Sequence, residues 1–162
     1  MSSSATRVEE LYVLYGSQTG NSEGAALEFC ENIKTTYSQA FFKKHNLDPI
    51  QVKTNCIQLD DFLEMKHADY TKCLVIFVSS YGVGQAPLGA YRFRDLCEDF
   101  LQNTTSEPIL AGLQYALCGL GDSSYPTFLQ NPTTIDKGLT AVGAKRIGDM
   151  GKGDANANVE VI

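Results

Sequence analysis

The sequence predicts one α/β domain, spanning residues 1–162, in which helices cover both faces of a five-stranded parallel sheet. Apolar, β-branched runs alternate along the chain with stretches whose apolar residues recur at helical spacing, and polar loops containing glycine follow three of those runs. With 162 residues, 43% of them hydrophobic, the chain can build one core but not a second domain. Because parallel sheets collect ligand contacts at the carboxyl ends of their strands, the three loops predict one shared binding site.

The first half of the chain supplies three of the expected strands. Residues 11–15 form a short apolar strand, and after a polar loop the chain changes to helical spacing, with one apolar face at Ala26, Cys30, Ile33 and Tyr37. Residues 41–49 are polar and turn-forming. Residues 50–55 alternate apolar and polar like an edge strand, whereas the β-branched and aromatic residues 73–78 predict a buried one.

The second half supplies the remaining elements. A helix is indicated by the spacing of Phe93, Leu96, Cys97, Phe100 and Leu101, and a strand follows at residues 113–117. Pro132 opens the next helix, which carries Ile135, Leu139 and Val142 and ends at Gly143. Residues 144–147 supply the last strand.

Composition narrows the function classes. The 13 Lys and Arg against 19 Asp and Glu give a net charge of -6, which argues against nucleic acid and favours a basic protein partner. The five cysteines are odd in number, lack metal-type spacing and fall mostly in apolar runs, as expected of reduced core residues in the cytoplasm. The longest apolar run, Cys73 to Val78, is too short to span a bilayer. The ending at Ile162 indicates a domain excised from a longer parent, which could itself be membrane-anchored.

The first loop offers hydroxyls and amides where a helix begins, at Ser17, Thr19, Asn21 and Ser22. The free N–H groups of a helix start bind a phosphate without any lysine. The loop lacks both the triphosphate motif Gly-x-x-x-x-Gly-Lys-Ser/Thr and the dinucleotide fingerprint Gly-x-Gly-x-x-Gly. The alternative is an ordinary capped turn, since Ser, Thr and Asn are the usual caps.

The second and third loops each bring a tyrosine. Tyr81 follows the most apolar strand, and Tyr125 follows the next one. Two such rings could sandwich a flat heteroaromatic group, although each tyrosine could equally pack on its own loop. Gly82 and Gly84 let the backbone approach a ligand and change its peptide orientation at little steric cost.

These motifs resemble those of the flavodoxins, and more closely those of the FMN-binding domain of the NADPH-dependent diflavin reductases, the group that includes cytochrome P450 reductase. Residues 15–20, followed by a small residue and Glu23, look like the family's phosphate loop, and residues 119–125 look like its third flavin loop. Residues 143–147 and 151–154 also match in order and spacing. The likeness therefore covers nearly the whole chain.

The resemblance implies a flavodoxin-like sandwich with strand order 2-1-3-4-5 and FMN at the switch point, a rule of which flavodoxin is the standard example. Residues 17–22 would hold the phosphate, Tyr81 and Tyr125 would stack on the flavin, and Asp154 would close the site. The Tyr81–Gly82 peptide is the candidate carbonyl for flavin N5 when the one-electron form is protonated. The implied cofactor contacts are Ser17, Gln18, Thr19, Gly20, Asn21, Ser22, Ser79, Ser80, Tyr81, Gly82, Leu120, Gly121, Asp122, Ser123, Ser124, Tyr125, Phe128, Leu129 and Asp154.

The chain departs from the family pattern in two loops. Where relatives usually read Tyr-Gly-Glu-Gly-Asp, this chain places Val83 and Gln85, so two negative charges are missing beside the flavin. Since reduced flavin gains negative charge, we expect reduction to be easier than in a more acidic relative. The loss also leaves open which acceptor docks there. In the third loop, Pro126 stiffens the chain directly after Tyr125.

The resemblance predicts an electron carrier that is not catalytic alone. FMN would receive electrons from an FAD domain that takes hydride from NADPH, on the same or a separate chain, and would pass them singly to a haem or iron–sulfur acceptor. We expect no catalytic side chain and no metal: His45 and His67 lie outside the loops, and Asp122 is a loop-capping residue. The alternatives are a free-standing flavodoxin shuttle, a two-electron flavin-dependent quinone reductase, and an interaction module that has lost FMN.

Overall fold

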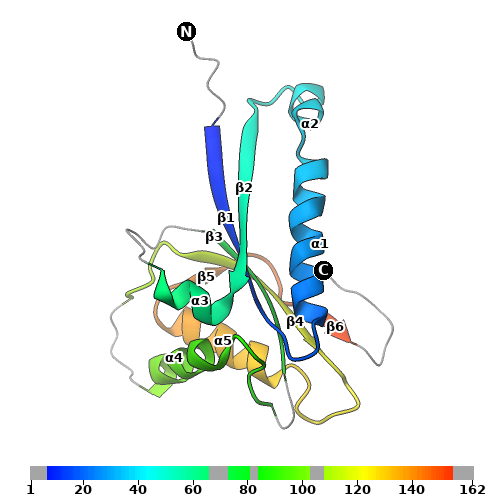
Figure 1. The fold of residues 1–162 in the computed structure, drawn as a ribbon. Coiled ribbons are helices and arrows are strands. Elements are labelled where there is room, and N and C mark those ends of the chain that lie inside the picture. Colours follow the sequence, from blue (N-terminus) through cyan, green and yellow to red (C-terminus); the bar gives the residue numbers. More distant parts are fainter. Residues whose placement is uncertain (1–6, 66–72, 81–83, 103–107, 155–162) are drawn as a thin grey trace.

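The computed structural model describes residues 7–65, 73–80, 84–102 and 108–154 (Figure 1). Its parallel sheet has the order β2-β1-β3-β4-β5, with β6 also paired to β4, which confirms the predicted fold class and strand order. The strands are β1 (Arg7–Gly16), β2 (Ile50–Gln58), β3 (Cys73–Ser79), β4 (Gln114–Gly121), β5 (Lys145–Arg146) and β6 (Gly151–Asp154).

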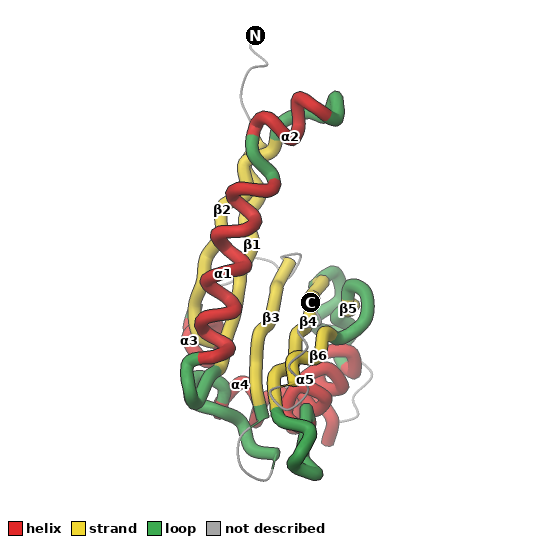
Figure 2. The backbone as a smooth tube through the Cα atoms, turned by 90° about the vertical axis from the view of Figure 1, so that its right-hand side faces the viewer, coloured by secondary structure: helices red, strands yellow, loops and turns green. Residues whose placement is uncertain are grey.

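Helices pack on both faces of the sheet, as Figures 1 and 2 show. Their bounds are α1 (Asn21–Thr36), α2 (Gln39–Lys44), α3 (Leu59–Glu64), α4 (Tyr91–Gln102) and α5 (Gln130–Ala141). Successive side chains of a strand point to opposite faces of the sheet. Val13 and Phe77 therefore pack against α1 on one face, whereas Leu14 and Ile76 belong to the core on the other face, which α3, α4 and α5 cover. The sheet therefore has two separate apolar cores.

α4 and α5 approach each other closely beneath the sheet. A Cβ atom on Gly138 would lie only 2.5 Å from the Cβ atom of Cys97, so the absence of a side chain at Gly138 permits this helix crossing. Beside the crossing, the hydroxyl of Tyr115 donates to Asp136, and Asp136 also pairs with Arg146 at 2.8 Å. These contacts fix α5 against β4 and β5.

Four features differ from the sequence-based expectations. The stretch expected to be only turn-forming, residues 41–49, begins inside helix α2. Phe42 of this helix is buried, and its ring packs edge-on against that of Phe41. α3 was not expected, although Asp60 and Asp61 in its first turn favour a helix start. α5 begins at Gln130, so Pro132 lies within its first turn.

The fourth difference is a sixth strand. β5 pairs with the start of β4, and β6 pairs with its end. The last strand expected at residues 144–147 is β5, whereas residues 147–150 belong to no strand and β6 was not expected. Lys145 and Gly151 accordingly lie further apart in the sequence than their partners Gln114 and Cys118. As a result, β6 reaches the edge of the sheet from which the three loops leave.

β1 and β2 extend beyond the rest of the sheet. β3 pairs with β1 only from Leu11 onward, whereas the pairing of β1 with β2 begins at Arg7 (Figure 2). This extension lies at the opposite end of β1 from the first loop. It therefore takes no part in positioning the candidate site.

Candidate functional site

The three polar loops leave neighbouring strands at one edge of the sheet. Gly16, the last residue of β1, pairs with Val78 of β3, and Val78 pairs with Gly119 of β4. Ser80 N also donates to Leu120 O at 3.3 Å, which joins the second loop directly to the third. The described parts of the three loops therefore lie at the same edge of the sheet, and their use as one binding site stays a prediction.

The first loop is a capped turn at the start of α1. Ser17 Oγ accepts hydrogen bonds from Gly20 N at 2.8 Å and from Ser22 N at 3.3 Å, while Gly20 itself is the N-cap residue. Thr19, Gly20 and Asn21 are exposed. The ordinary capped turn, which the sequence indicated as the alternative to a phosphate site, is thus present. It still leaves exposed polar groups at the start of the helix that can bind an anion.

The donor set of this loop fits a phosphate. The Ser22 hydroxyl is fully buried and has no hydrogen-bond partner among the described residues, so it has an unused donor directly behind the loop. The positive end of the helix dipole and the hydroxyls of Ser17 and Thr19 are further groups that favour an anion. The neighbouring Glu23 carboxylate accepts a hydrogen bond from Tyr15 OH at 3.0 Å. Burial, and secondarily this bond, raises the pKa of Tyr15 to about 12.

Leu88 holds the first loop in place. Ser17 N donates to Leu88 O at 3.0 Å, and Leu88 N donates to Gln18 Oε1 at 3.2 Å. No local sequence pattern indicates this reciprocal contact, because its partners are 70 residues apart. Gln18 is therefore engaged in positioning the loop.

The second loop is described at its two ends. Ser79 and Ser80 are half-buried, and both bond to Asn131 at the start of α5. Gly84, at the other end, is buried and has φ +88. Tyr81 and Gly82 lie outside the described residues, so their contacts with a flavin stay a prediction.

The third loop is ordered by two carboxylates. Asp122 Oδ1 accepts hydrogen bonds from Ser124 N at 2.9 Å and from Ser124 Oγ at 2.6 Å, which is the geometry of a loop-capping residue. Asp154, on β6, accepts from Ser123 N at 2.9 Å. The side chain of Tyr125 lies at the tip with 61% of its surface exposed, so it can serve as a stacking platform.

Phe128 and Leu129 form the base of this loop. A Cβ atom on Gly121 would lie 2.9 Å from Phe128 Cδ1, so the aromatic ring packs directly beneath the glycine backbone. Leu129 is 5% exposed and packs beneath Gly119. Gly121 and Leu120 are half-buried above them. Phe128 and Leu129 thus support the loop from inside the protein.

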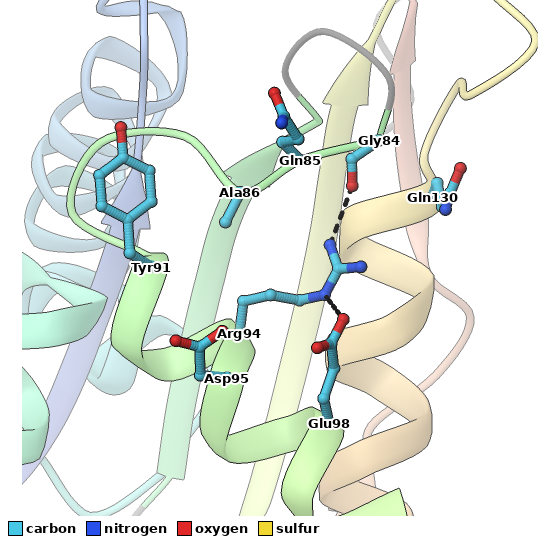
Figure 3. Close-up of a pocket in the computed structure, with 8 residues that line it drawn as sticks. All are labelled: Gly84, Gln85, Ala86, Tyr91, Arg94, Asp95, Glu98 and Gln130. Atoms are coloured by element: carbon cyan, nitrogen blue, oxygen red, sulfur yellow. Dashed lines mark hydrogen bonds and ion pairs between the residues drawn. The ribbon is translucent and has the colours of Figure 1, made fainter.

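A cavity of about 480 Å³ lies beside the second loop, between Gly84–Ala86, α4 and Gln130 (Figure 3). Its charged lining consists of Arg94, Asp95 and Glu98. Among the described residues, none of those expected to contact the cofactor lines this cavity. No group of three or more potential metal-ligating side chains occurs in the described ranges.

Comparison with known proteins links this arrangement to a family. The family model described as flavodoxin matches residues 13–160. The chain is 34% identical to NADPH–cytochrome P450 reductase of Saccharomyces cerevisiae over 145 residues, which are 90% of this chain and 18% of that protein. It is 32% identical to methionine synthase reductase of Caenorhabditis elegans, over 94% of this chain and 20% of that protein. The chain thus spans about a fifth of the length of these relatives.

Solved structures show the same fold. Oxidised Flavodoxin 1 from Bacillus cereus superposes with a TM-score of 0.59 at 16% identity, covering 91% of this chain and 86% of that one. Flavodoxin 2 from the same organism gives a TM-score of 0.56 at 21% identity, covering 93% and 88%. Within the described part of the chain, no helix has both the length and the apolar character needed to cross a bilayer.

Proposed function

This chain belongs to the flavodoxin family, and on that premise we propose that its FMN accepts electrons from an NADPH- and FAD-containing reductase domain and passes them singly to a haem or iron–sulfur protein. FMN is the cofactor of this family, and electron transfer is its function. The reductase domain lies on the same or a separate chain. The relatives named as NADPH–cytochrome P450 reductase and as sulfite reductase [NADPH] flavoprotein alpha-component support the choice of NADPH as the electron source.

One observation carries this proposal: the phosphate-compatible start of α1 lies on the same edge as the exposed ring of Tyr125. An anion site for the phosphate and an aromatic platform for the ring system, both at the carboxyl ends of parallel strands, are what an FMN site calls for. Here these two features follow β1 and β4, with β3 between them. The buried Ser22 hydroxyl, which has no hydrogen-bond partner in the part of the chain that the structure describes, would be a further donor beside this anion site.

The protein residues bind and orient the cofactor, and FMN when bound supplies the one- and two-electron redox chemistry. Ser17–Ser22 would hold the phosphate, and Tyr125 would cover one face of the ring system. Asp154 and Asp122 would act indirectly, because they hold the third loop in shape. No general acid or base is required of any side chain.

A partner with a basic docking surface fits the net charge of -6. A haem or iron–sulfur protein that presents lysines around its exposed cofactor would meet this requirement. A two-electron quinone reductase is the competing function, since it would use the same cofactor with an uncovered flavin face.

The test is an anaerobic redox titration of the FMN-loaded protein, followed by mixing of the reduced protein with oxidised cytochrome c. We expect two resolved one-electron reduction steps and reduction of one haem for each electron stored. A single two-electron step, together with NADPH- or quinone-dependent turnover by this chain alone, would support the competing function instead.

A further inference from the structure

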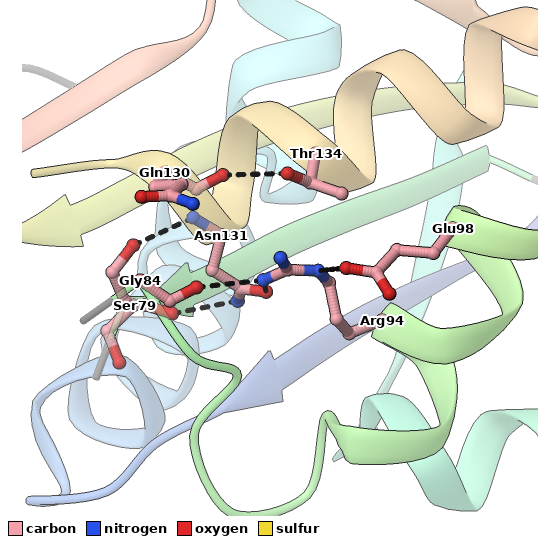
Figure 4. Close-up of polar contacts among 8 residues, drawn as sticks. Ser79, Gly84, Arg94, Glu98, Gln130, Asn131 and Thr134 are labelled. Carbon is pink, nitrogen blue, oxygen red and sulfur yellow. Dashed lines mark hydrogen bonds and ion pairs between the residues drawn. The ribbon is translucent and has the colours of Figure 1, made fainter. Parts of the chain in front are cut away.

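A buried polar network joins the second loop to α4 and α5 (Figure 4). Its centre is Asn131, which is fully buried in the first turn of α5. Asn131 Nδ2 donates to Ser79 O at 2.9 Å, and Asn131 N donates to Ser80 Oγ at 2.9 Å. One residue thus holds two consecutive positions at the point where β3 ends.

Arg94 extends the network to the other end of the loop. Its NH1 group donates to Asn131 Oδ1 at 2.8 Å and to Gly84 O at 2.9 Å, while its Nε donates to Glu98 at 2.8 Å. The Arg94 side chain is only 15% exposed. Because the guanidinium is a rigid fork, these three bonds fix its position relative to both helices.

The two ends of the loop are therefore tied to each other. Ser79 and Ser80 precede residues 81–83, and Gly84 follows them. A single chain of hydrogen bonds runs from Ser79 through Asn131 and Arg94 to Gly84 (Figure 4). The network thus fixes the points at which the chain enters and leaves the expected flavin contacts.

Gly84 is fitted closely into this arrangement. Its φ of +88 is disfavoured for other residues, and an added Cβ atom would lie 2.5 Å from Gln130 Cδ. The backbone of the loop therefore packs directly on the first residue of α5. Since the third loop leads into α5 through Leu129, the same helix start supports both loops.

A buried Asn and a nearly buried Arg are costly choices where apolar side chains could fill the space. Every polar group of Asn131 named here has a partner from a loop or from α4. Satisfied networks of this kind fix one arrangement of the surrounding chain. The positions fixed here are the described ends of the second loop, Ser79, Ser80 and Gly84.

We propose that Arg94 and Asn131 are positioning residues that hold the ends of the second loop and thereby set the separation between the two one-electron reduction potentials of bound FMN. This inference rests on the proposed function. Loop contacts that differ between redox states enter the potentials directly as free energies. If the ends of the loop are loosened, the redox state of FMN that depends most on one loop arrangement should lose the most stability. We expect that state to be the one-electron reduced form, so the two potentials should move closer together.

Two variants test the network. Arg94→Lys keeps the positive charge but removes the planar group that bonds Glu98 through Nε while its NH1 reaches both Asn131 and Gly84. Asn131→Asp keeps the side-chain shape and the acceptor for Arg94 but loses the donor to Ser79 O. The matched control is Arg92→Lys, because Arg92 lies on the same helix and pairs with Glu64 at 2.6 Å at an exposed position.

The first measurement is a redox titration of each FMN-loaded variant. For Arg94→Lys and Asn131→Asp we expect about a tenfold change in the equilibrium between the one- and two-electron reduced forms, which is about 59 mV for a one-electron couple. Arg92→Lys should match the wild type. Unchanged potentials in both network variants would overturn the proposal.

The second measurement needs no flavin. Amide hydrogen exchange of the apoprotein should be faster at Ser80 and Gly84 in Arg94→Lys than in Arg92→Lys, while the core of β3 exchanges at the wild-type rate. Equal exchange at these two amides would overturn the anchoring role. If the wild type binds no FMN, the proposed function is wrong, and so is the link between the network and the reduction potentials. If FMN binds normally but the variants leave the hydrogen exchange unchanged, only the present inference is overturned. Should Asn131→Asp fail to fold, Arg94→Lys decides both measurements.

Discussion

Ser17 is the residue on which the structure of the first loop depends most directly. Its hydroxyl accepts hydrogen bonds from Gly20 N and Ser22 N, so it caps α1 from outside the helix. The same hydroxyl is expected to contact the FMN phosphate. A substitution at this position should therefore affect both folding and binding.

We predict that Ser17→Ala lowers the free energy of unfolding of the apoprotein by about 1 kcal/mol, the usual cost of losing a cap. It should also raise the FMN dissociation constant by about tenfold, because a hydrogen bond to a charged group is worth about 1.5–3 kcal/mol. Urea unfolding and flavin fluorescence quenching measure the two effects. Ser38→Ala is the control, since Ser38 is the N-cap of α2 without a side-chain cap bond, and equal FMN affinity in the two variants would contradict the prediction.

Gly84 and Gly24 form a second test, with opposite expected signs. Gly84→Ala introduces strain at φ +88 and a contact with Gln130, so the apoprotein should lose about 1–3 kcal/mol of stability. A Cβ atom on Gly24 would meet nothing within 4 Å, and Ala is favoured over Gly within a helix, so Gly24→Ala should gain about 0.5–1 kcal/mol. Chemical denaturation of both variants checks this. Destabilisation of similar size in both would refute the backbone argument.

Individual contacts differ in how well the sequence predicts them. The capping role of Asp122 could be predicted, because its hydrogen bonds reach only two residues along the chain. The bond between Arg94 and Asn131 spans 37 residues and depends on how α4 crosses α5, which no local pattern encodes. Leu129 adopts φ 61, which is rare for a bulky residue. Its buried position at the start of α5 could therefore not be predicted from residue propensities either.

At the scale of elements, the crossing of α4 and α5 determines where Arg94 and Asn131 meet. Cys97 is fully buried at this crossing, against Gly138. Burial raises the pKa of the Cys97 thiol to about 12 from an ordinary value of 9.0, and the nearby charge of Arg94 lowers it by less. The thiol is therefore protonated in the folded protein at neutral pH.

This shift predicts a loss of stability at alkaline pH. Well below pH 9 the thiol is protonated in both the folded and the unfolded state, so its stabilising contribution is complete. Between pH 9 and 12 only the unfolded chain releases the proton, so stability falls as the pH rises through that range. Urea unfolding at pH 8, 9 and 10 should show a decline that is shallower in Cys97→Ala. An identical decline in the variant would contradict the assignment to Cys97.

Elements with strong local patterns were predicted well. The apolar run predicted at residues 73–78 is β3, Cys73–Ser79, and the alternating run at 50–55 lies within edge strand β2. β6 could not be predicted, because Gly151–Asp154 has no apolar alternation and becomes a strand only by pairing with the end of β4. α2 depends on aromatic contacts around Phe41, which a polar composition conceals.

At the scale of the whole molecule, the sheet order brings the three loops to one edge, and the chain as a whole is acidic. With a net charge of -6, encounter with a basic acceptor should be steered by electrostatics. The strength of this steering depends on ionic strength.

We therefore predict that reduction of cytochrome c by the reduced, FMN-loaded protein slows as salt is raised from about 0.01 to 0.15 M, over which the screening length falls from about 30 to 8 Å. Stopped-flow kinetics measure this rate. Ferricyanide, an anionic acceptor, serves as the control, and its reduction should not slow with salt. A rate for cytochrome c that is independent of salt would show that the acidic charge does not guide docking.

The most direct test of the account is a comparison of FMN with riboflavin, which has the same ring system and no phosphate. The apoprotein is titrated with each flavin, and binding is measured by the quenching of flavin fluorescence. We expect one FMN site and an affinity for riboflavin that is at least about a hundredfold weaker, because riboflavin cannot make the phosphate contacts at the start of α1. Equal affinity for both flavins would contradict the assignment of the first loop as a phosphate site, and failure to bind either flavin would contradict the electron-transfer function as well.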